Sequence, residues 1–190
     1  MEKVLKNSLL LVALVTGISL YAADRVEVSV DEAQTLIVEL DQVKTISLED
    51  ASGFTLFKDS PVLEGNYKKQ IDFTRIPKGT YFLHAEDLYG VYTTVINKTS
   101  KGIMIEKKTP AVVFKPIYKI EADQVKFFLT NPAKTFASLS VYDAKGELVG
   151  EVKDKAYTMN KTFDFSNMPK GQYTFRLRVS GEVFIEKLSI

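Results

Sequence analysis

Residues that could do chemistry are few in this sequence of 190 residues. His84 is the one histidine, and cysteine is absent. A zinc site of the usual Cys/His type therefore cannot form. A Ser-His-Asp triad would have to use His84, which lies in the middle of an expected strand with no nucleophile-elbow sequence near it. We expect an ordinary strand histidine and a protein that is not an enzyme.

Carboxylates are more common, but they are scattered over expected strand ends, such as Glu49-Asp50, Glu86-Asp87 and Asp164. Calcium takes six to eight oxygens from clustered loops, and no EF-hand or dense Asp/Asn loop is present. Asp72 and Asp164 each precede a phenylalanine, where we expect them to bond to turn backbone. No phosphate-binding loop or dinucleotide fingerprint occurs. We expect no catalytic residue, no metal and no cofactor, with calcium at the strand ends as the open alternative.

The overall charge of the chain is nearly balanced and gives no sign of a partner, such as nucleic acid, that is attracted by net charge. The chain has 25 Lys and Arg against 24 Asp and Glu. Such a balance creates no global field that would steer nucleic acid. We therefore expect no nucleic-acid partner.

The N-terminus has the pattern of a signal peptide. Lys3 and Lys6 precede an apolar run, residues 8–20, which ends at Tyr21-Ala22-Ala23. The run is shorter than the roughly 20 residues of a membrane span. We predict a signal peptide over residues 1–22, with cleavage after Ala22 or else Ala23; an uncleaved anchor is the alternative. The cleaved chain would have no integral membrane span and would lie in the periplasm, at the cell surface or outside the cell.

After Asp24 the chain shows short alternating runs separated by turn residues, the pattern of an all-β protein. No stretch has a convincing helical period. The expected strands are Val26–Val30, Thr35–Leu40, Val43–Glu49, Phe54–Lys58, Lys69–Phe73, Thr80–Asp87, Val91–Asn97, Ile103–Glu106, Ile117–Glu121, Val125–Thr130, Ala137–Tyr142, Glu147–Val152, Thr162–Phe165, Gln172–Ser180 and Val183–Ser189.

One strand-turn-strand stretch occurs twice, as residues 71–83 and 163–175. Both copies read apolar-Asp-Phe, then Ser or Thr, then Pro-Lys-Gly-x-Tyr, in which proline and glycine suit the turn. Asp-Ala-x-Gly hairpins also recur in the same order, so we infer a duplication. The turn residues of the two copies are Asp50, Gly53, Pro77, Gly79, Tyr81 and Asp143, Gly146, Pro169, Gly171, Tyr173.

Each half holds about seven strands, the content of an immunoglobulin-like antiparallel β-sandwich. We predict a first module over residues 23–108, a linker over 109–116 and a second module over 117–190. Prolines and lysines make the linker stiff, and its apolar insert Ala111–Phe114 indicates that it packs on something.

Strand register assigns the side chains to two faces. In the second copy Tyr173, Phe175, Leu177 and Val179 face the core, whereas Arg176 and Arg178 face water. In the first copy Tyr81, Leu83 and Ala85 take the core face.

The same register places Phe82 and His84 on the outer face of the first module. An outward phenylalanine is explained by burial between the modules, by a partner-binding patch or by isolated exposure. Phe82 and His84 are the candidate interaction patch.

The second half resembles the C-terminal sorting domain of the type IX secretion system of Bacteroidetes. The resemblance rests on Asn131-Pro132-Ala133, Asp143–Gly146, Phe163–Ser166 and Pro169–Tyr173, with a strand running to Ile190. It covers about residues 125–190, with a weaker echo over 35–97, and Leu129-Thr130 replaces the Tyr-Pro usual in the family. The resemblance implies a β-sandwich that addresses a secreted protein to the outer-membrane translocon. It brings no catalytic residue.

Three functions stay open on the sequence. The first is a secreted, non-catalytic pair of immunoglobulin-like repeats that binds a protein or contributes to the cell surface; an envelope or secretion-machinery component is one option for the unknown partner. The second is the sorting role of the second module. The third is a carbohydrate-binding module that uses Tyr89 and Tyr92 as sugar platforms.

Overall fold

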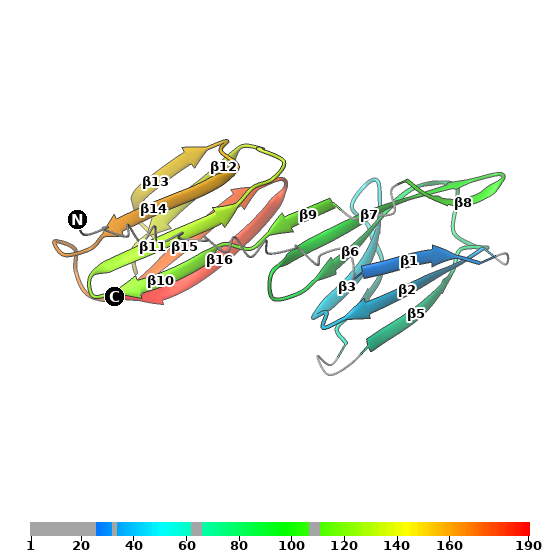
Figure 1. Cartoon of the computed structure of the whole chain (residues 1–190), viewed down its shortest axis with the longest axis horizontal. Helices are drawn as coiled ribbons and strands as arrows, with labels where there is room; N and C mark the ends of the chain where they lie inside the picture. The colour runs from blue at the N-terminus through cyan, green and yellow to red at the C-terminus, as the bar shows by residue number, and fades with distance from the viewer. Residues whose placement is uncertain (1–25, 32–33, 62–65, 107–110) are drawn as a thin grey trace, which may run out of the picture.

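The computed structural model describes residues 26–31, 34–61, 66–106 and 111–190. The predicted signal peptide, residues 1–22, lies outside these ranges. Within them the chain is all-β, and no helix is long and apolar enough to cross a membrane. Figure 1 shows two sandwiches side by side along the longest axis of the molecule. The predicted fold class, two tandem immunoglobulin-like antiparallel sandwiches, is confirmed.

The first module packs a three-stranded sheet against a larger one. The small sheet has the order β1-β2-β5, and the large sheet has the order β4-β3-β6-β7-β8, with β9 also paired to β7. The strands are β1 (Val26–Val30), β2 (Thr35–Asp41), β3 (Thr45–Asp50), β4 (Thr55–Asp59), β5 (Asn66–Asp72), β6 (Gly79–Glu86), β7 (Gly90–Thr99), β8 (Gly102–Ile105) and β9 (Ala111–Phe114).

The second module repeats this arrangement. Its sheets have the orders β10-β11-β14 and β13-β12-β15-β16, which match β1-β2-β5 and β4-β3-β6-β7 strand for strand. All pairings are antiparallel. The strands are β10 (Ile117–Glu121), β11 (Gln124–Thr130), β12 (Ala137–Tyr142), β13 (Leu148–Asp154), β14 (Thr158–Asp164), β15 (Gln172–Val179) and β16 (Glu182–Ser189).

Each module has a core of its own between its two sheets. The inward side chains of β15, from Tyr173 to Val179, are at most 3% exposed, and those of β6 are at most 4% exposed. Arg178 is exposed and Arg176 is half-buried. The predicted alternation is therefore confirmed in both copies. Burying a Leu- or Phe-sized side chain contributes about 1.5–3 kcal/mol, so these rows supply much of the folding free energy.

The repeated Pro-Lys-Gly-x-Tyr stretch forms a tyrosine corner at the start of β6 and of β15. The hydroxyl of Tyr81 donates to the carbonyl oxygen of Pro77 at 2.7 Å, and Tyr173 donates to Pro169 at 2.6 Å. A buried phenylalanine packs on each tyrosine: Phe73 lies 5.6 Å from Tyr81 between ring centroids. The stretch thus locks the strand-to-strand corner of each sandwich.

The Asp-Ala-x-Gly hairpins are held by side chain to backbone bonds. Asp50 Oδ1 accepts from the backbone nitrogens of Ser52 at 2.8 Å and of Phe54 at 3.0 Å. Asp143 makes the equivalent bonds in the second module. Gly53, with φ of 84°, takes the left-handed position that disfavours other residues. Hydrogen bonds, the side chain of Ser52 first, hold the pKa of Asp50 below its ordinary value.

The segment predicted as a linker, residues 109–116, contains a strand. β9 runs antiparallel to β7, with Val113 opposite Val91 and Val112 opposite Tyr92. The backbone nitrogen of Lys115 donates to the carbonyl oxygen of Tyr89 at 2.7 Å. This connection is therefore fastened to the first module before the chain enters β10.

Candidate functional site

The edge strand β16 distinguishes the second module from the first. In the first module the equivalent strand, β7, is covered along its outer edge by β9 and β8. β16 pairs with β15 alone among the described residues. Its outward side chains Val183 and Ile185 are 45% and 58% exposed. An exposed apolar edge is unusual, because natural proteins generally cover or charge such edges.

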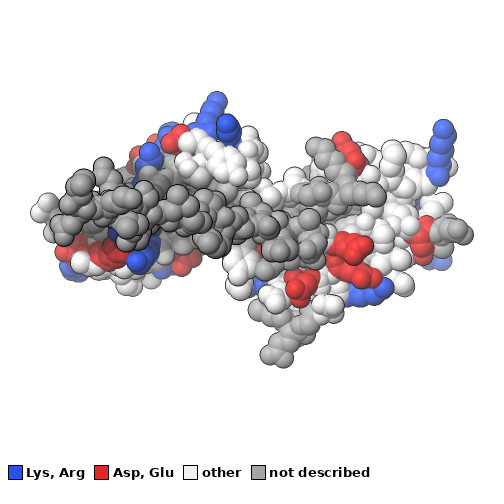
Figure 2. All heavy atoms as spheres, in the orientation of Figure 1, with Lys and Arg blue, Asp and Glu red and all other residues white. Residues whose placement is uncertain are grey.

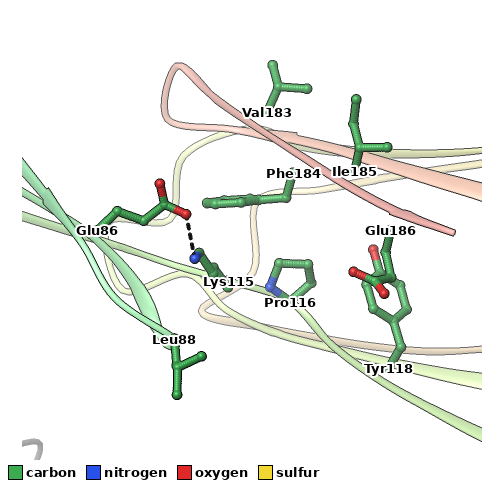
Figure 3. Close-up of a pocket in the computed structure, with 9 residues that line it drawn as sticks. All are labelled: Glu86, Leu88, Lys115, Pro116, Tyr118, Val183, Phe184, Ile185 and Glu186. Carbon is green, nitrogen blue, oxygen red and sulfur yellow. Dashed lines mark ion pairs between the residues drawn. The ribbon is translucent and has the colours of Figure 1, made fainter. Parts of the chain in front are cut away.

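A cleft of about 390 Å³ separates the first half of β16 from the junction between the modules. Figure 3 shows Phe184 reaching from β16 toward Lys115, with Pro116 beside it. Lys115 Nζ lies 2.6 Å from Glu86 Oε1 and donates to the carbonyl oxygen of Asp87 at 2.6 Å. The lysine thus holds the end of β6 against the chain that leads into the second module.

Tyr118 also lines this cleft and lies beside Glu186 in Figure 3. Its ring packs against Phe127 and Phe175, with centroids 5.5 Å and 5.3 Å away. Its hydroxyl oxygen is buried and has no hydrogen-bond partner among the described residues. Burial, and secondarily the charge of Glu186, raises the pKa of Tyr118 far above its ordinary value. The phenol is therefore neutral at any physiological pH.

The candidate patch Phe82 and His84 lies on the outer face of β6, half-buried. The two rings are stacked, with centroids 6.4 Å apart and planes 21° from parallel. His84 Nδ1 is 2.9 Å from Thr93 Oγ1, and Nε2 is 4.0 Å from Glu49 Oε2. A cleft of about 400 Å³ beside His84 is also lined by Glu182 of the second module. The patch therefore borders the junction, and its binding role stays a prediction.

The other carboxylates singled out in the sequence serve turns. Asp72 and Asp164 accept from the backbone nitrogens of Thr74 and Ser166 at 2.7 Å and 2.9 Å. Hydrogen bonds hold the pKa of both carboxyl groups below the ordinary value. The main cause is the side-chain bond to Thr74 for Asp72 and the backbone bond to Ser166 for Asp164. Asp87 is buried and accepts from the backbone nitrogen of Gly90 at 2.8 Å. Over the described ranges, no three His, Cys, Asp or Glu side chains group closely enough to hold a metal ion.

The prediction that Tyr89 and Tyr92 offer platforms for a sugar is wrong for Tyr92. Tyr92 is 3% exposed, and its hydroxyl donates to Asp87 Oδ2 at 3.2 Å. Its ring belongs to the first core and lies on the same face of β7 as the buried Thr94 and Ile96, so the alternation of the strand itself turns Tyr92 inward. Tyr89 is 56% exposed, but the buried Tyr92 cannot serve as a second platform beside it.

Sequence reasoning placed Lys115 and Pro116 in the linker but missed their contacts, and it did not single out Tyr118. Lys115, Pro116 and Tyr118 carried no motif, and their proximity to β16 depends on the placement of the second module. The one available signal was the apolar insert Ala111–Phe114, which indicated packing but not its partner.

Asn131 of the Asn-Pro motif has a structural place. It is 4% exposed, and its amide nitrogen donates to the carbonyl oxygens of Thr135 at 2.8 Å and of Ala156 at 3.2 Å. It thus ties the loop after β11 to the loop after β13.

Comparison with known families supports the resemblance. Residues 121–190 match the family model of the secretion system C-terminal sorting domain. This match begins inside β10 and covers the rest of the second module. The predicted resemblance of the second half to this family is thereby confirmed.

Comparison with individual proteins gives fold-level likeness at most. No curated protein matches the chain. Among solved structures, a biofilm-associated protein (BSP domain) has a TM-score of 0.32 and 13% identity, covering 87% of this chain and 29% of that one. The human OSCAR ligand-binding domain has a TM-score of 0.26 and 11% identity, covering 87% and 98%. At these scores the likenesses bear on no functional argument.

Proposed function

We propose that the second module is a type IX sorting domain that directs the chain to the outer membrane, for release or display outside the cell. The first module is the part that is delivered. The observation that carries this proposal is the match of residues 121–190 to the sorting-domain family. The module also has a core separate from that of the first, so it can be recognised as a folded unit.

The recognition surface in this proposal includes β16. Val183 and Ile185 are exposed in the folded module, so a partner can reach them without unfolding it. An unpaired strand edge also offers backbone groups to a partner strand, which is a common mode of protein recognition. Both features belong to the last strand, as expected for a signal that is read at the C-terminal end of the module.

The delivered module acts, on this proposal, by binding rather than by catalysis. Its single histidine is engaged by Thr93, and the stacked Phe82 and His84 present an aromatic surface beside an acidic cleft. A partner protein is the class of ligand that such a surface fits. Phe82→Ser should reduce capture of envelope proteins by the purified chain, whereas Phe54→Ser, at a 69% exposed position, should not.

Export tests the sorting role directly. In a bacterium with type IX secretion, the full chain should reach the medium or the cell surface, and a chain lacking residues 121–190 should stay in the periplasm. Val183→Ser with Ile185→Ser should lower the exported fraction while melting like the wild type. The control is Phe54→Ser with Leu56→Ser, which removes two exposed apolar side chains from the first module. Equal export of the truncated chain would refute the proposal.

A further inference from the structure

The outer face of the four-stranded sheet in the second module carries two neighbouring arginines. Arg176 lies opposite Ser140 of β12 and opposite Ile185 of β16, and Arg178 lies opposite Ser138 and Val183. Because they are two residues apart on β15, their side chains leave the same face about 7 Å apart. The two rows form a cationic strip with serine hydroxyls on one side and exposed aliphatic side chains on the other. We call it the arginine strip.

Neither arginine forms an ion pair with any carboxylate that the structure describes. On β13, Glu151 lies two strands from Arg176, is bound by Lys153 Nζ at 2.6 Å and accepts from Ser138 Oγ at 3.3 Å. Arg176 Nε is buried and has no hydrogen-bond partner among the described residues. A buried donor without an acceptor is costly, so pairing of this guanidinium group with a carboxylate would be favourable.

The surroundings of the arginine strip suit a peptide rather than a small anion. A cleft of about 390 Å³ is lined by Phe136, Ser138, Arg178 and Val183, and also by the charged side chains Glu151, Lys153 and Glu182. Phe136 is 52% exposed and provides an aromatic contact. Aliphatic and aromatic side chains beside paired guanidinium groups are suited to a chain that alternates acidic and apolar residues.

The arginine strip belongs to the second module alone. The positions of Arg176 and Arg178 correspond to His84 and Glu86 in the first module, by the pairing of each with β3 or β12. Glu86 is there engaged by Lys115. The duplicated scaffold does not require arginine at either position, so a role in holding the sandwich does not account for the pair.

We propose that the arginine strip binds an acidic, extended segment of a protein partner. In an extended chain, residues i and i+2 lie on one side about 7 Å apart, which equals the spacing of the two arginines. Each carboxylate of a Glu-x-Glu segment can therefore pair with one of the two guanidinium groups. Arginine and a carboxylate form such pairs with two parallel hydrogen bonds. Ile185 and Val183 then cover the aliphatic parts of the bound segment. The proposal does not depend on the sorting role.

The test is the affinity of the purified protein for the fluorescein-labelled peptide Glu-Val-Glu-Ser-Glu-Val, measured by fluorescence anisotropy at low salt. Arg176→Gln with Arg178→Gln should weaken binding by about tenfold or more, since two charge-assisted pairs are lost. Lys145→Gln with Lys155→Gln removes the same charge at two exposed positions and should change affinity by less than about twofold. The peptide with glutamine for glutamate should not bind.

The single variant Arg178→Gln separates an effect on binding from an effect on folding, because Arg178 is exposed and the half-buried Arg176 is kept. It should weaken binding while the melting temperature stays unchanged. Equal affinity of the wild type and the double glutamine variant for the acidic peptide would refute the proposal. So would equal binding of the glutamine peptide. Self-association that needs the arginines, without peptide binding, would overturn it in favour of a second copy of this chain.

Discussion

Val112 and Val113 are neighbours in β9, yet their side chains pack against different cores. Val112 packs on the core of the first module, and Val113 packs on the core of the second. A strand sends successive side chains to opposite faces, so a four-residue strand can join two sandwiches. β9 is therefore both the last strand of the first module and a structural contact of the second.

Substitutions of the two valines should destabilise different modules. Val113→Ala should lower the stability of the second module by about 1 kcal/mol, because a half-buried aliphatic contact is lost. Val112→Ala should affect the first module by a similar amount. Hydrogen exchange, followed separately in β15 and in β6, reports the two modules. Equal effects of either valine on both modules would contradict this division.

Gly90→Ala should detach β9 from β7. A Cβ at Gly90 would lie 2.7 Å from the carbonyl oxygen of Val113, which is backbone and cannot move without the strand. We expect a loss of about 1–3 kcal/mol and faster exchange over residues 111–114. The control is Gly150→Ala in β13, where the nearest atom, Val141 Cβ, is 4.0 Å away. Unchanged exchange in β9 of the Gly90 variant would show that the pairing tolerates the methyl group.

The tyrosine corners should each contribute about 1 kcal/mol or somewhat more. Tyr81→Phe removes the bond to the carbonyl oxygen of Pro77, and Tyr173→Phe removes the bond to Pro169, while ring packing is kept. Chemical denaturation of each variant measures the loss. Tyr157→Phe, at a 47% exposed tyrosine, should change stability by less than about 0.5 kcal/mol. A corner variant as stable as the Tyr157 control would mean that water replaces the lost bond at no cost.

Acid should weaken the second module through Glu121. Hydrogen bonds from Lys119 and then Lys126 lower the pKa of Glu121 from 4.5 to about 2. A lowered folded-state pKa means that the carboxylate stabilises the fold above pH 4.5 and that this contribution is lost as pH falls to about 2. Because the group is exposed, the effect should be small and should shrink further in salt.

Thermal melting across this pH range, compared between the wild type and Glu121→Gln, measures the contribution of Glu121. The two proteins should differ at neutral pH and converge near pH 2. Parallel curves over the whole range would show that the carboxylate contributes nothing.

Local chemistry explains why so much of the fold was predictable. Period-two alternation in residues 172–180 and 80–87 was enough to assign inward and outward side chains, since a strand fixes them geometrically. Turn residues such as Gly53 and Gly146, with φ of 84° and 82°, mark hairpins wherever they occur. Every expected strand is present, with ends that differ by at most four residues; the largest difference is at β14, which begins at Thr158 and not at Thr162. The duplication followed from recurrence of these same local signals.

Tertiary structure decided what no local pattern contains. The Ala111–Phe114 insert became a strand only because β7 had a free edge beside it, and an edge is a property of the folded sheet. Val91, on the outer face of β7, is buried as well as its inward neighbour Tyr92, and this departure from alternation occurs where β9 pairs with β7. Likewise, the clefts at Lys115 and His84 form where two modules meet. The sequence therefore determined the strands, turns and side-chain faces of each sandwich, whereas long-range packing determined the junction and the surfaces open to a partner.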